Sequence, residues 1–329
     1  MDIVCLGELL IDMFPAEVGR RLVEVSAFHP KPGGAPANVA VAAARLGAKS
    51  AFIGKVGDDA FGHFLMDTLA HEQVDTAGMR LDPAARTTMA FIALPDPNHA
   101  EFVFYRNPGA DTCLRPDELD HELLQQAAVL HFGSVSLSVE PSRSATLAAV
   151  RLARAAGALI SFDVNYRPSL WPNPAEALEV ILDVLPQVHL LKVNDVELEL
   201  LSGSKNLDSG SQALLERGPE LGVVTLGPNG SFFRSAQGSG SVPGFTVPTV
   251  DAIGCGDAFV AGLLTQLLAL PLAGRGPGRG SWRDQLNPNH LRQIVRYANA
   301  VGALTATKQG VIPALPTTAE VRQFLVQNS

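Results

Sequence analysis

The stretch Asp251-Ala252-Ile253-Gly254-Cys255-Gly256-Asp257, followed by the apolar run 258–264, predicts a glycine-rich turn at the start of a buried helix. The first turn of a helix leaves backbone N–H groups without partners, and the helix dipole adds partial positive charge there. Because Gly254, Cys255 and Gly256 carry little side chain, their amides are open to phosphate oxygens. Asp257 would then lie beside the group being phosphorylated and accept its proton. An ordinary turn with Asp257 as helix cap is the alternative.

The composition is that of a globular protein with a large core. Of the 329 residues, 47% are hydrophobic and 18% are charged, and the net charge is −8. This acidic balance argues against a nucleic-acid or anionic-membrane surface, where clustered Lys and Arg are expected. The apolar stretch 258–272 is shorter than the ~20 residues of a membrane span, so we expect a core helix. Cys5, Cys113 and Cys255 lack metal-binding spacing, and we expect reduced thiols in a cytoplasmic protein without a signal peptide.

Short β-rich runs alternate with amphipathic helical patterns along most of the chain. The expected strands are 3–7, 50–54, 129–133, 158–163, 190–194 and 222–227, and the expected helices include 39–46, 144–156, 175–185 and 196–201. This alternation predicts a single α/β domain over residues 1–329, with a mostly parallel central sheet flanked by helices. Ligands of such sheets bind at the carboxyl ends of the strands, which is where Asp12, Asp163 and Asn194 fall.

Three segments interrupt the alternation. Segments 14–30 and 87–106 are β-rich without a convincing helix, and we expect them to form a small antiparallel β lid over the site; surface hairpins are the alternative. Edge strands of such a lid could pair across a homodimer, which would hide them from solvent. The Gly-rich stretch 271–281 superficially suggests a phosphate loop. No strand precedes it and Pro277 fits poorly with a helix start, so we expect a surface loop there.

A second glycine-rich turn, Gly33-Gly34-Ala35-Pro36-Ala37-Asn38, precedes the helical pattern 39–46. Paired glycines let a backbone pass close to a ligand, and the Asn38 amide can exchange hydrogen bonds with sugar hydroxyls. By itself the signal is weak, because a loop-to-helix turn with proline near its start has the same pattern. In combination with the turn that ends at Asp257, it is far more informative.

Together the two turns resemble the two signatures of the ribokinase-like (PfkB) carbohydrate kinases, and further similarities span nearly the whole chain. Asn194-Asp195-Val196-Glu197 is similar to the family's N-x-x-E motif, and Thr225-Leu226-Gly227-Pro228-Asn229-Gly230 resembles its nucleotide-cradling loop. Residues 7–12 fit its opening strand and substrate aspartate. The resemblance implies a ribokinase-like fold with a small β lid and an ATP-dependent sugar kinase that uses Mg²⁺.

The resemblance also implies roles for individual residues. Asp257 would be the catalytic base, and the amides of Gly254, Cys255 and Gly256 would form an anion hole for the transferred phosphoryl group. Asn194 and Glu197 would organise Mg²⁺, Glu197 through water, with a helix-capping arrangement as the structural alternative. The residues implied in sugar binding are Asp12, Gly33, Gly34, Asn38, Arg106 and Arg167. Those implied in ATP binding are Asn194, Glu197, Thr225, Gly227, Gly230 and Asn299.

A monovalent cation beside the anion hole is a further implication of the resemblance. A K⁺ ion would be held by the Asp251 carboxylate and by the backbone carbonyls of Ile253, Thr305, Lys308 and Gly310. Ala314 departs from the serine that some members place there, and Ala252 and Cys255 depart from the usual threonine and alanine. A thiol at a helix N-terminus favours the thiolate, so we expect Cys255 to react with thiol reagents.

Within the family the chain most resembles fructokinases. The similar segments are 105–111, 131–134, 191–197 and 310–317. This resemblance implies transfer of phosphate from ATP to D-fructose, giving fructose 6-phosphate. A 2-keto-3-deoxygluconate kinase is the alternative, in which Arg106 and Arg167 would clamp the substrate carboxylate. A non-catalytic sugar- or nucleotide-binding protein of the same fold is the alternative from another class, and the presence of Asp257 and the glycines argues against it.

Overall fold

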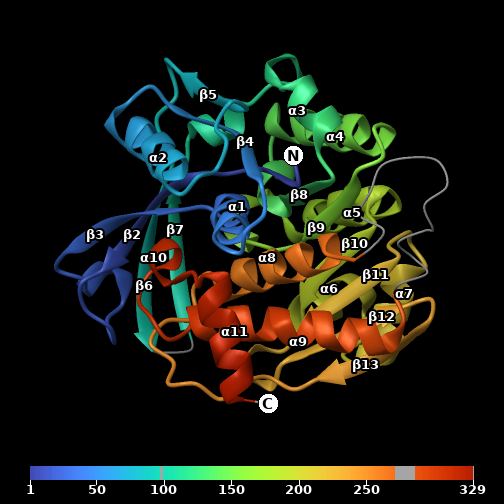
Figure 1. Ribbon diagram of the computed structural model, residues 1–329. Coiled ribbons are helices and arrows are strands. Elements are labelled where there is room, and N and C mark those ends of the chain that lie inside the picture. Colours follow the sequence, from blue (N-terminus) through green and yellow to red (C-terminus); the bar gives the residue numbers. More distant parts are fainter. Residues whose placement is uncertain (97–98, 271–285, 329) are drawn as a thin grey trace.

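A nine-stranded sheet runs through the centre of the computed structural model, which describes residues 1–96, 99–270 and 286–328 (Figure 1). Its strands lie in the order β13-β12-β11-β10-β9-β8-β1-β4-β5. They are β1 (Ile3–Leu6), β4 (Ser50–Gly57), β5 (Met79–Asp82), β8 (Val129–Gly133), β9 (Leu159–Asp163), β10 (Leu190–Asn194), β11 (Leu221–Thr225), β12 (Ser231–Ser235) and β13 (Gly238–Val242). The strands from β11 to β5 pair in parallel, and β12 and β13 add an antiparallel edge. The predicted mostly parallel sheet is confirmed.

Helices cover both faces of this sheet because its strands are apolar on both sides. In β1, Ile3 and Cys5 pack into one core cluster, and Val4 and Leu6 pack into the other. The first cluster includes side chains of α1 (Ala35–Arg45), α2 (Ala60–His71), α8 (Cys255–Leu268), α9 (Pro288–Thr305) and α11 (Thr318–Gln327). The second includes α3 (His121–Gln126), α4 (Ser142–Ala155), α5 (Pro174–Val184), α6 (Asp195–Ser202) and α7 (Leu207–Leu215). Strands buried on both faces are typical of parallel sheets.

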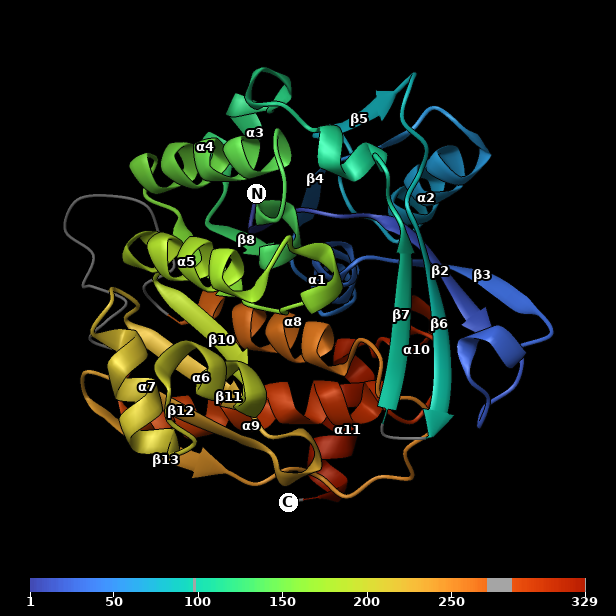
Figure 2. The same cartoon turned by 180° about the vertical axis from the view of Figure 1, so that it is seen from behind.

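A separate four-stranded sheet stands at one side of the molecule (Figure 2). Its order is β3 (Phe28–Gly33), β2 (Leu10–Pro15), β6 (Met89–Asp96) and β7 (His99–Tyr105). The expected lid sheet is therefore present, but it begins at Leu10 rather than at residue 14. The central β2–β6 pair is parallel rather than antiparallel, with Ile11 opposite Met89. Both strands follow parallel strands of the large sheet, β1 and β5, and so enter the small sheet in the same direction.

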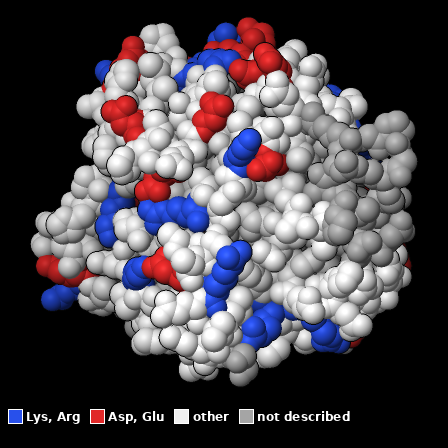
Figure 3. Space-filling model, viewed as in Figure 1, with Lys and Arg blue, Asp and Glu red and all other residues white. Residues whose placement is uncertain are grey.

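On the face drawn in Figure 3, acidic and basic side chains are interspersed among uncharged ones. In the described ranges, no helix is both long enough and apolar enough to cross a bilayer. The loop expected at 271–281 lies outside the described residues.

Candidate active site

The two glycine-rich turns meet at the start of α8. Asp257 lies in the first turn of this helix, and its Oδ2 accepts a hydrogen bond of 2.8 Å from the Nδ2 of Asn38 on α1. The N-cap of α8 is Gly254, not Asp257, so the helix-cap interpretation of this aspartate is wrong. Burial raises the pKa of the Asp257 carboxyl, and the bond from Asn38 and the charges of Lys192 and Arg167 oppose that rise. A buried carboxylate therefore lies beside a helix N-terminus, as a base for phosphoryl transfer requires.

Asp12 lies on the small sheet, in β2, rather than at the end of a large-sheet strand. It is buried, and burial together with the nearby charge of Asp257 raises its pKa to about 7. A Cβ atom at Gly33 would overlap Asp12 Oδ2, so the absence of a side chain at Gly33 leaves room for the Asp12 carboxylate in this position. The expected sugar residues Asp12, Gly33 and Asn38 thus converge on Asp257.

The two arginines occupy different positions. Arg106 follows β7, and its Nε lies 2.9 Å from Asp111 Oδ2 while its Nη1 donates to Ser138 Oγ at 3.3 Å. Its side chain is only 6% exposed, so protein partners fix it at the base of the small sheet. Arg167 instead lies over the Phe102 ring of β7, 5.6 Å from its centre, and its charge lowers the pKa of both Asp12 and Asp257. Arg167 therefore faces the two carboxylates of the site.

Lys192 is a site residue that the sequence analysis missed. It lies on β10 opposite Asp163 of β9, and its Nζ lies 3.0 and 3.1 Å from the two carboxylate oxygens. A Cβ atom on Gly256 would lie 3.3 Å from this Nζ, so the ammonium lies beside Gly256 of the expected anion hole. Burial alone would lower the pKa of Lys192, but the charges of Asp163 and Glu197 outweigh it and raise the pKa. A lysine within the apolar run 190–193 was the available signal.

Asn194 and Glu197 form the helix-capping arrangement that was the structural alternative. Asn194 Oδ1 accepts the Glu197 N–H, and Glu197 Oε2 accepts the Asn194 N–H, both at 2.8 Å. Glu197 Oε1 accepts the N–H of Tyr166 at 2.8 Å. Both carboxylate oxygens are thus held by backbone donors. Oxygen ligands suit Mg²⁺, and this arrangement fits a contact through retained water rather than direct coordination.

The expected nucleotide residues lie around the ends of β11 and β12. Thr225 ends β11, Gly227 begins the 3₁₀ turn Gly227–Asn229, and Gly230 follows that turn directly before β12. Asn299, on α9, accepts a hydrogen bond from Ser231 Oγ at 2.9 Å and donates to the carbonyls of residues 242 and 243. The Asn299 amide therefore ties α9 to the antiparallel edge of the sheet.

Asp251 joins the two loops expected to hold K⁺. Its Oδ1 accepts the Ile253 N–H at 2.9 Å, and its Oδ2 accepts the Gly310 N–H at 3.0 Å. Its own N–H donates to the Ala306 carbonyl at 3.3 Å. The backbone segments 251–253 and 305–310 are thus brought together, and their carbonyl oxygens are of the type that suits a hard cation. The Lys308 side chain turns to Glu320, 3.3 Å away, which leaves only its carbonyl for this role.

The expectation that the helix N-terminus favours the Cys255 thiolate is wrong. Burial, together with the negative charges of Asp251 and Asp257, raises the pKa of its thiol to about 12. The partial positive charge of the helix N-terminus is outweighed because two carboxylates and a poorly hydrated environment all disfavour the thiolate. The ionisation of the thiol does not affect the backbone amide of Cys255, which is the group expected to contribute to the anion hole.

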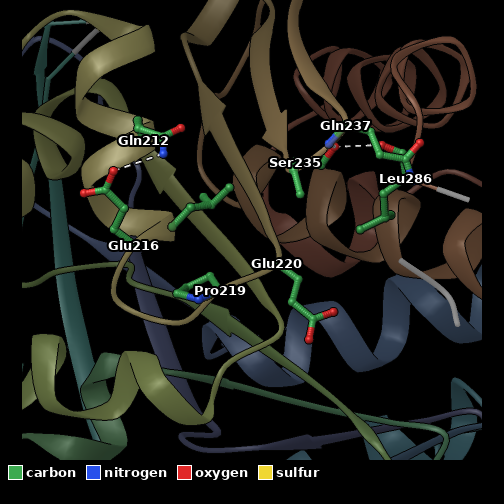
Figure 4. A pocket seen from close by; sticks show the side chains of 9 residues that line it. Gln212, Glu216, Pro219, Glu220, Ser235, Gln237 and Leu286 are labelled. Atoms are coloured by element: carbon green, nitrogen blue, oxygen red, sulfur yellow. Dashed lines mark hydrogen bonds between the residues drawn. The ribbon is translucent and has the colours of Figure 1, made fainter. Parts of the chain in front are cut away.

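Two cavities differ in their relation to the site. One of about 400 Å³ lies beside the amino end of β11 (Figure 4), at the opposite end of that strand from Thr225. It is lined by Gln212, Leu215, Glu216, Pro219, Glu220, Ser235, Ala236, Gln237 and Leu286. Another of about 530 Å³ lies between β7 and residues 139–140 and 169–170, with Phe102 and Arg106 in its wall. Only the second adjoins the small sheet, so we assign it to the vicinity of the site.

Comparison with known proteins supports the same interpretation. Residues 1–318 match the pfkB family carbohydrate kinases. A probable fructokinase-2 of Arabidopsis thaliana is 46% identical over 327 residues, covering 98% of this chain and 95% of its own. Fructokinase-1 of Zea mays is 45% identical over 324 residues, covering 98% and 97%.

Solved structures agree with the sequence relatives. The fructokinase of Xylella fastidiosa with bound ATP superposes with a TM-score of 0.88 at 34% identity, covering 99% of this chain and 98% of its own. A Vibrio cholerae fructokinase double mutant with fructose, ADP and potassium ion has a TM-score of 0.86 at 34% identity, covering 98% of each chain. The fold is therefore ribokinase-like, and the chain belongs to the pfkB family of carbohydrate kinases.

Proposed function

We propose that this carbohydrate kinase transfers the γ-phosphoryl group of ATP to D-fructose, giving fructose 6-phosphate. The observation that carries the proposal is the Asp257 carboxylate, held by Asn38 at the N-terminus of α8 with the Lys192 ammonium beside it. The substrate is inferred from the plant fructokinases, at 44–46% identity over nearly the whole chain, and from the fructose-bound bacterial structure. These relatives favour fructose over 2-keto-3-deoxygluconate.

In the proposed mechanism, Asp12 and Asn38 orient the sugar and Asp257 accepts its hydroxyl proton. An ordinary carboxylate suffices as base because the proton leaves late in a loose transition state. The amides of residues 254–256 and the Lys192 ammonium stabilise charge on the transferred group. Mg²⁺, when bound, would neutralise charge on the phosphate oxygens, with Glu197 holding it through water.

The positions of the arginines support the sugar over the keto acid. The clamp of the keto-acid alternative, which uses Arg106 and Arg167 together, needs both guanidinium groups free to face one carboxylate. Arg106 is instead committed to Asp111 and Ser138, which leaves Arg167 as the arginine facing Asp12 and Asp257. A non-catalytic binding role is less well supported, because a base, an anion hole and a buried ammonium all converge on one point.

Potassium activation and a homodimer through the small sheet are part of the proposal. The joined loops around Asp251 support a K⁺ site, and the potassium-bound bacterial structure is consistent with it. On the small sheet, Phe28, Phe91 and Tyr105 form edge-to-face pairs, and Tyr105 and Val103 are 63% and 42% exposed. Such an exposed apolar surface favours a second copy. Light scattering after gel filtration should give a dimer mass, and Tyr105→Asp should shift it toward the monomer.

The function is tested by coupled ADP release with fructose, glucose, ribose, adenosine and 2-keto-3-deoxygluconate. Fructose should give the highest kcat/KM, and a clear preference for the keto acid would overturn the assignment. Asp257→Asn should lower kcat by about 10²–10⁴-fold, the range for loss of a general base. Calorimetric ATP binding should persist in that variant. Turnover close to wild type would show that Asp257 is not the base.

A further inference from the structure

A small apolar cluster connects the small sheet with the turn at residues 251–257, which contains the expected anion hole. Phe14 of β2, Ile92 of β6 and Val311 of α10 (Val311–Ala314) are buried together, and Phe102 and Ile253 pack against them. This cluster is separate from the two cores that flank the large sheet. It therefore joins three strands of the small sheet to Ile253, in the turn before α8, and to Val311 at the start of α10.

Val311 packs directly on Gly254. This glycine is the N-cap of α8 and adopts a left-handed conformation with φ of +79°. A Cβ atom at Gly254 would overlap Val311 Cγ1, and Val311 Cγ2 would lie 3.0 Å from it. Because Gly254 has no side chain, the branched valine is in direct contact with its backbone. The Val311 side chain thus limits where the first amides of α8 can lie.

The opposite side of the cluster belongs to the strand that carries Asp12. Phe14 follows Asp12 by two residues in β2, so both side chains lie on the same face of the strand. A second contact joins the same parts. The Lys31 Nζ of β3 lies 4.7 Å from the centre of the Phe14 ring, and it would lie 2.8 Å from a Cβ atom on Gly310.

We propose that Val311 is a positioning residue for phosphoryl transfer: it sets the backbone of Gly254 and connects it, through Phe14 and Ile92, to the strand that presents Asp12. The inference rests on the proposed kinase function and deepens it. A shift of the small sheet, which carries Asp12, would therefore also move the backbone amides at the start of α8 that face the phosphate in the proposed mechanism. Loss of this packing should affect the transition state more than the binding of either substrate.

The test compares Val311→Ala with Val321→Ala. Val321 is an equally buried valine on α11 and belongs to the core cluster that includes Ile3 and Cys5 of β1. Both variants lose two methyl-sized groups and should show lowered melting temperatures. Val311→Ala should lower kcat about tenfold or more, because small misplacements of catalytic groups are costly. Its KM for fructose and its calorimetric ADP affinity should change less than threefold. Val321→Ala should keep kcat within twofold of wild type.

The link to the small sheet is tested by Ile92→Ala and by the double variant Val311→Ala/Ile92→Ala. Ile92→Ala should also lower kcat, and the double variant should lose less than the product of the two single effects, because both act through one contact. If Val311→Ala keeps kcat within twofold, the positioning role is overturned. If Ile92→Ala keeps kcat within twofold, or if the kcat effects of the two single variants multiply in the double variant, the proposed link between Val311 and the small sheet is overturned. Absence of sugar-kinase activity in the wild type would refute the proposed function instead.

Discussion

Removing the buried ammonium of Lys192 should abolish most turnover while the fold survives, provided that its partner is removed too. Lys192→Met alone would leave the Asp163 carboxylate buried without its partner, which typically costs about 3–5 kcal/mol of stability. We therefore choose the double variant Lys192→Met/Asp163→Leu. Replacing both members of a buried pair with apolar side chains of similar size is often neutral for stability.

The magnitude follows from the position of the ammonium against Gly256. A unit charge about 5 Å from the transferred group, at an effective dielectric constant of about 20, contributes roughly 3 kcal/mol. A loss of that size lowers kcat by about 10²-fold. The assay is coupled ADP release at saturating fructose and ATP, with urea unfolding measured in parallel. Lys55→Met is the control, because that buried lysine pairs with Asp82 and Glu118 at 3.0 and 2.8 Å, apart from the site.

The control should lose stability and keep its kcat. If Lys192→Met/Asp163→Leu is folded and retains kcat within threefold of wild type, the ammonium does not stabilise the transition state, and our placement of it in the anion hole is wrong.

Three further predictions concern the neighbouring groups. The pKa of Asp12 is raised to about 7, so the folded state loses stability when this carboxyl ionises above that pH. Asp12→Asn should therefore stabilise the protein by at most about 4 kcal/mol at pH 8 and by much less near pH 4. Equal unfolding free energies of the variant and the wild type at both pH values would refute this prediction. Gly33→Ala should raise the KM for fructose at least tenfold by displacing the Asp12 carboxylate. Gly47→Ala, at a glycine whose added Cβ atom would meet nothing within 4 Å, should leave the KM unchanged in the same assay. N-ethylmaleimide at pH 7.5 should leave the enzyme largely active, and Cys255→Ala should be equally resistant, because the pKa of this thiol is about 12; rapid inactivation prevented by ATP would contradict it.

Much of the site could be predicted from local sequence because its chemistry is in backbone turns. Two glycine-rich turns, each followed by a helical pattern, were ambiguous one by one, and their combination carried the resemblance to the carbohydrate kinases. The parallel sheet was likewise predictable, since β-rich runs alternated with helical ones. Asp163 and Asn194 do end strands of the large sheet, as expected, whereas Asp12 lies on the small sheet.

Contacts between distant segments required the tertiary structure. The ionisation of Cys255 depends on Asp251, on Asp257 and on burial. Its position at a helix N-terminus therefore predicted a favoured thiolate wrongly. The ion pair between Lys192 and Asp163 depends on the register of β9 and β10, two strands that are separated in the chain by α5.

The turn at residues 251–257 has some properties that follow from its local sequence and others that depend on distant residues. The sequence by itself determined that small residues would expose amides at the start of a helix, because that property is local to the turn. Only the tertiary structure decided that Asp257 bonds to Asn38, that Lys192 lies against Gly256 and that Val311 packs on Gly254. These contacts join residues far apart in the chain, and their positions depend on how the sheet and its covering helices pack.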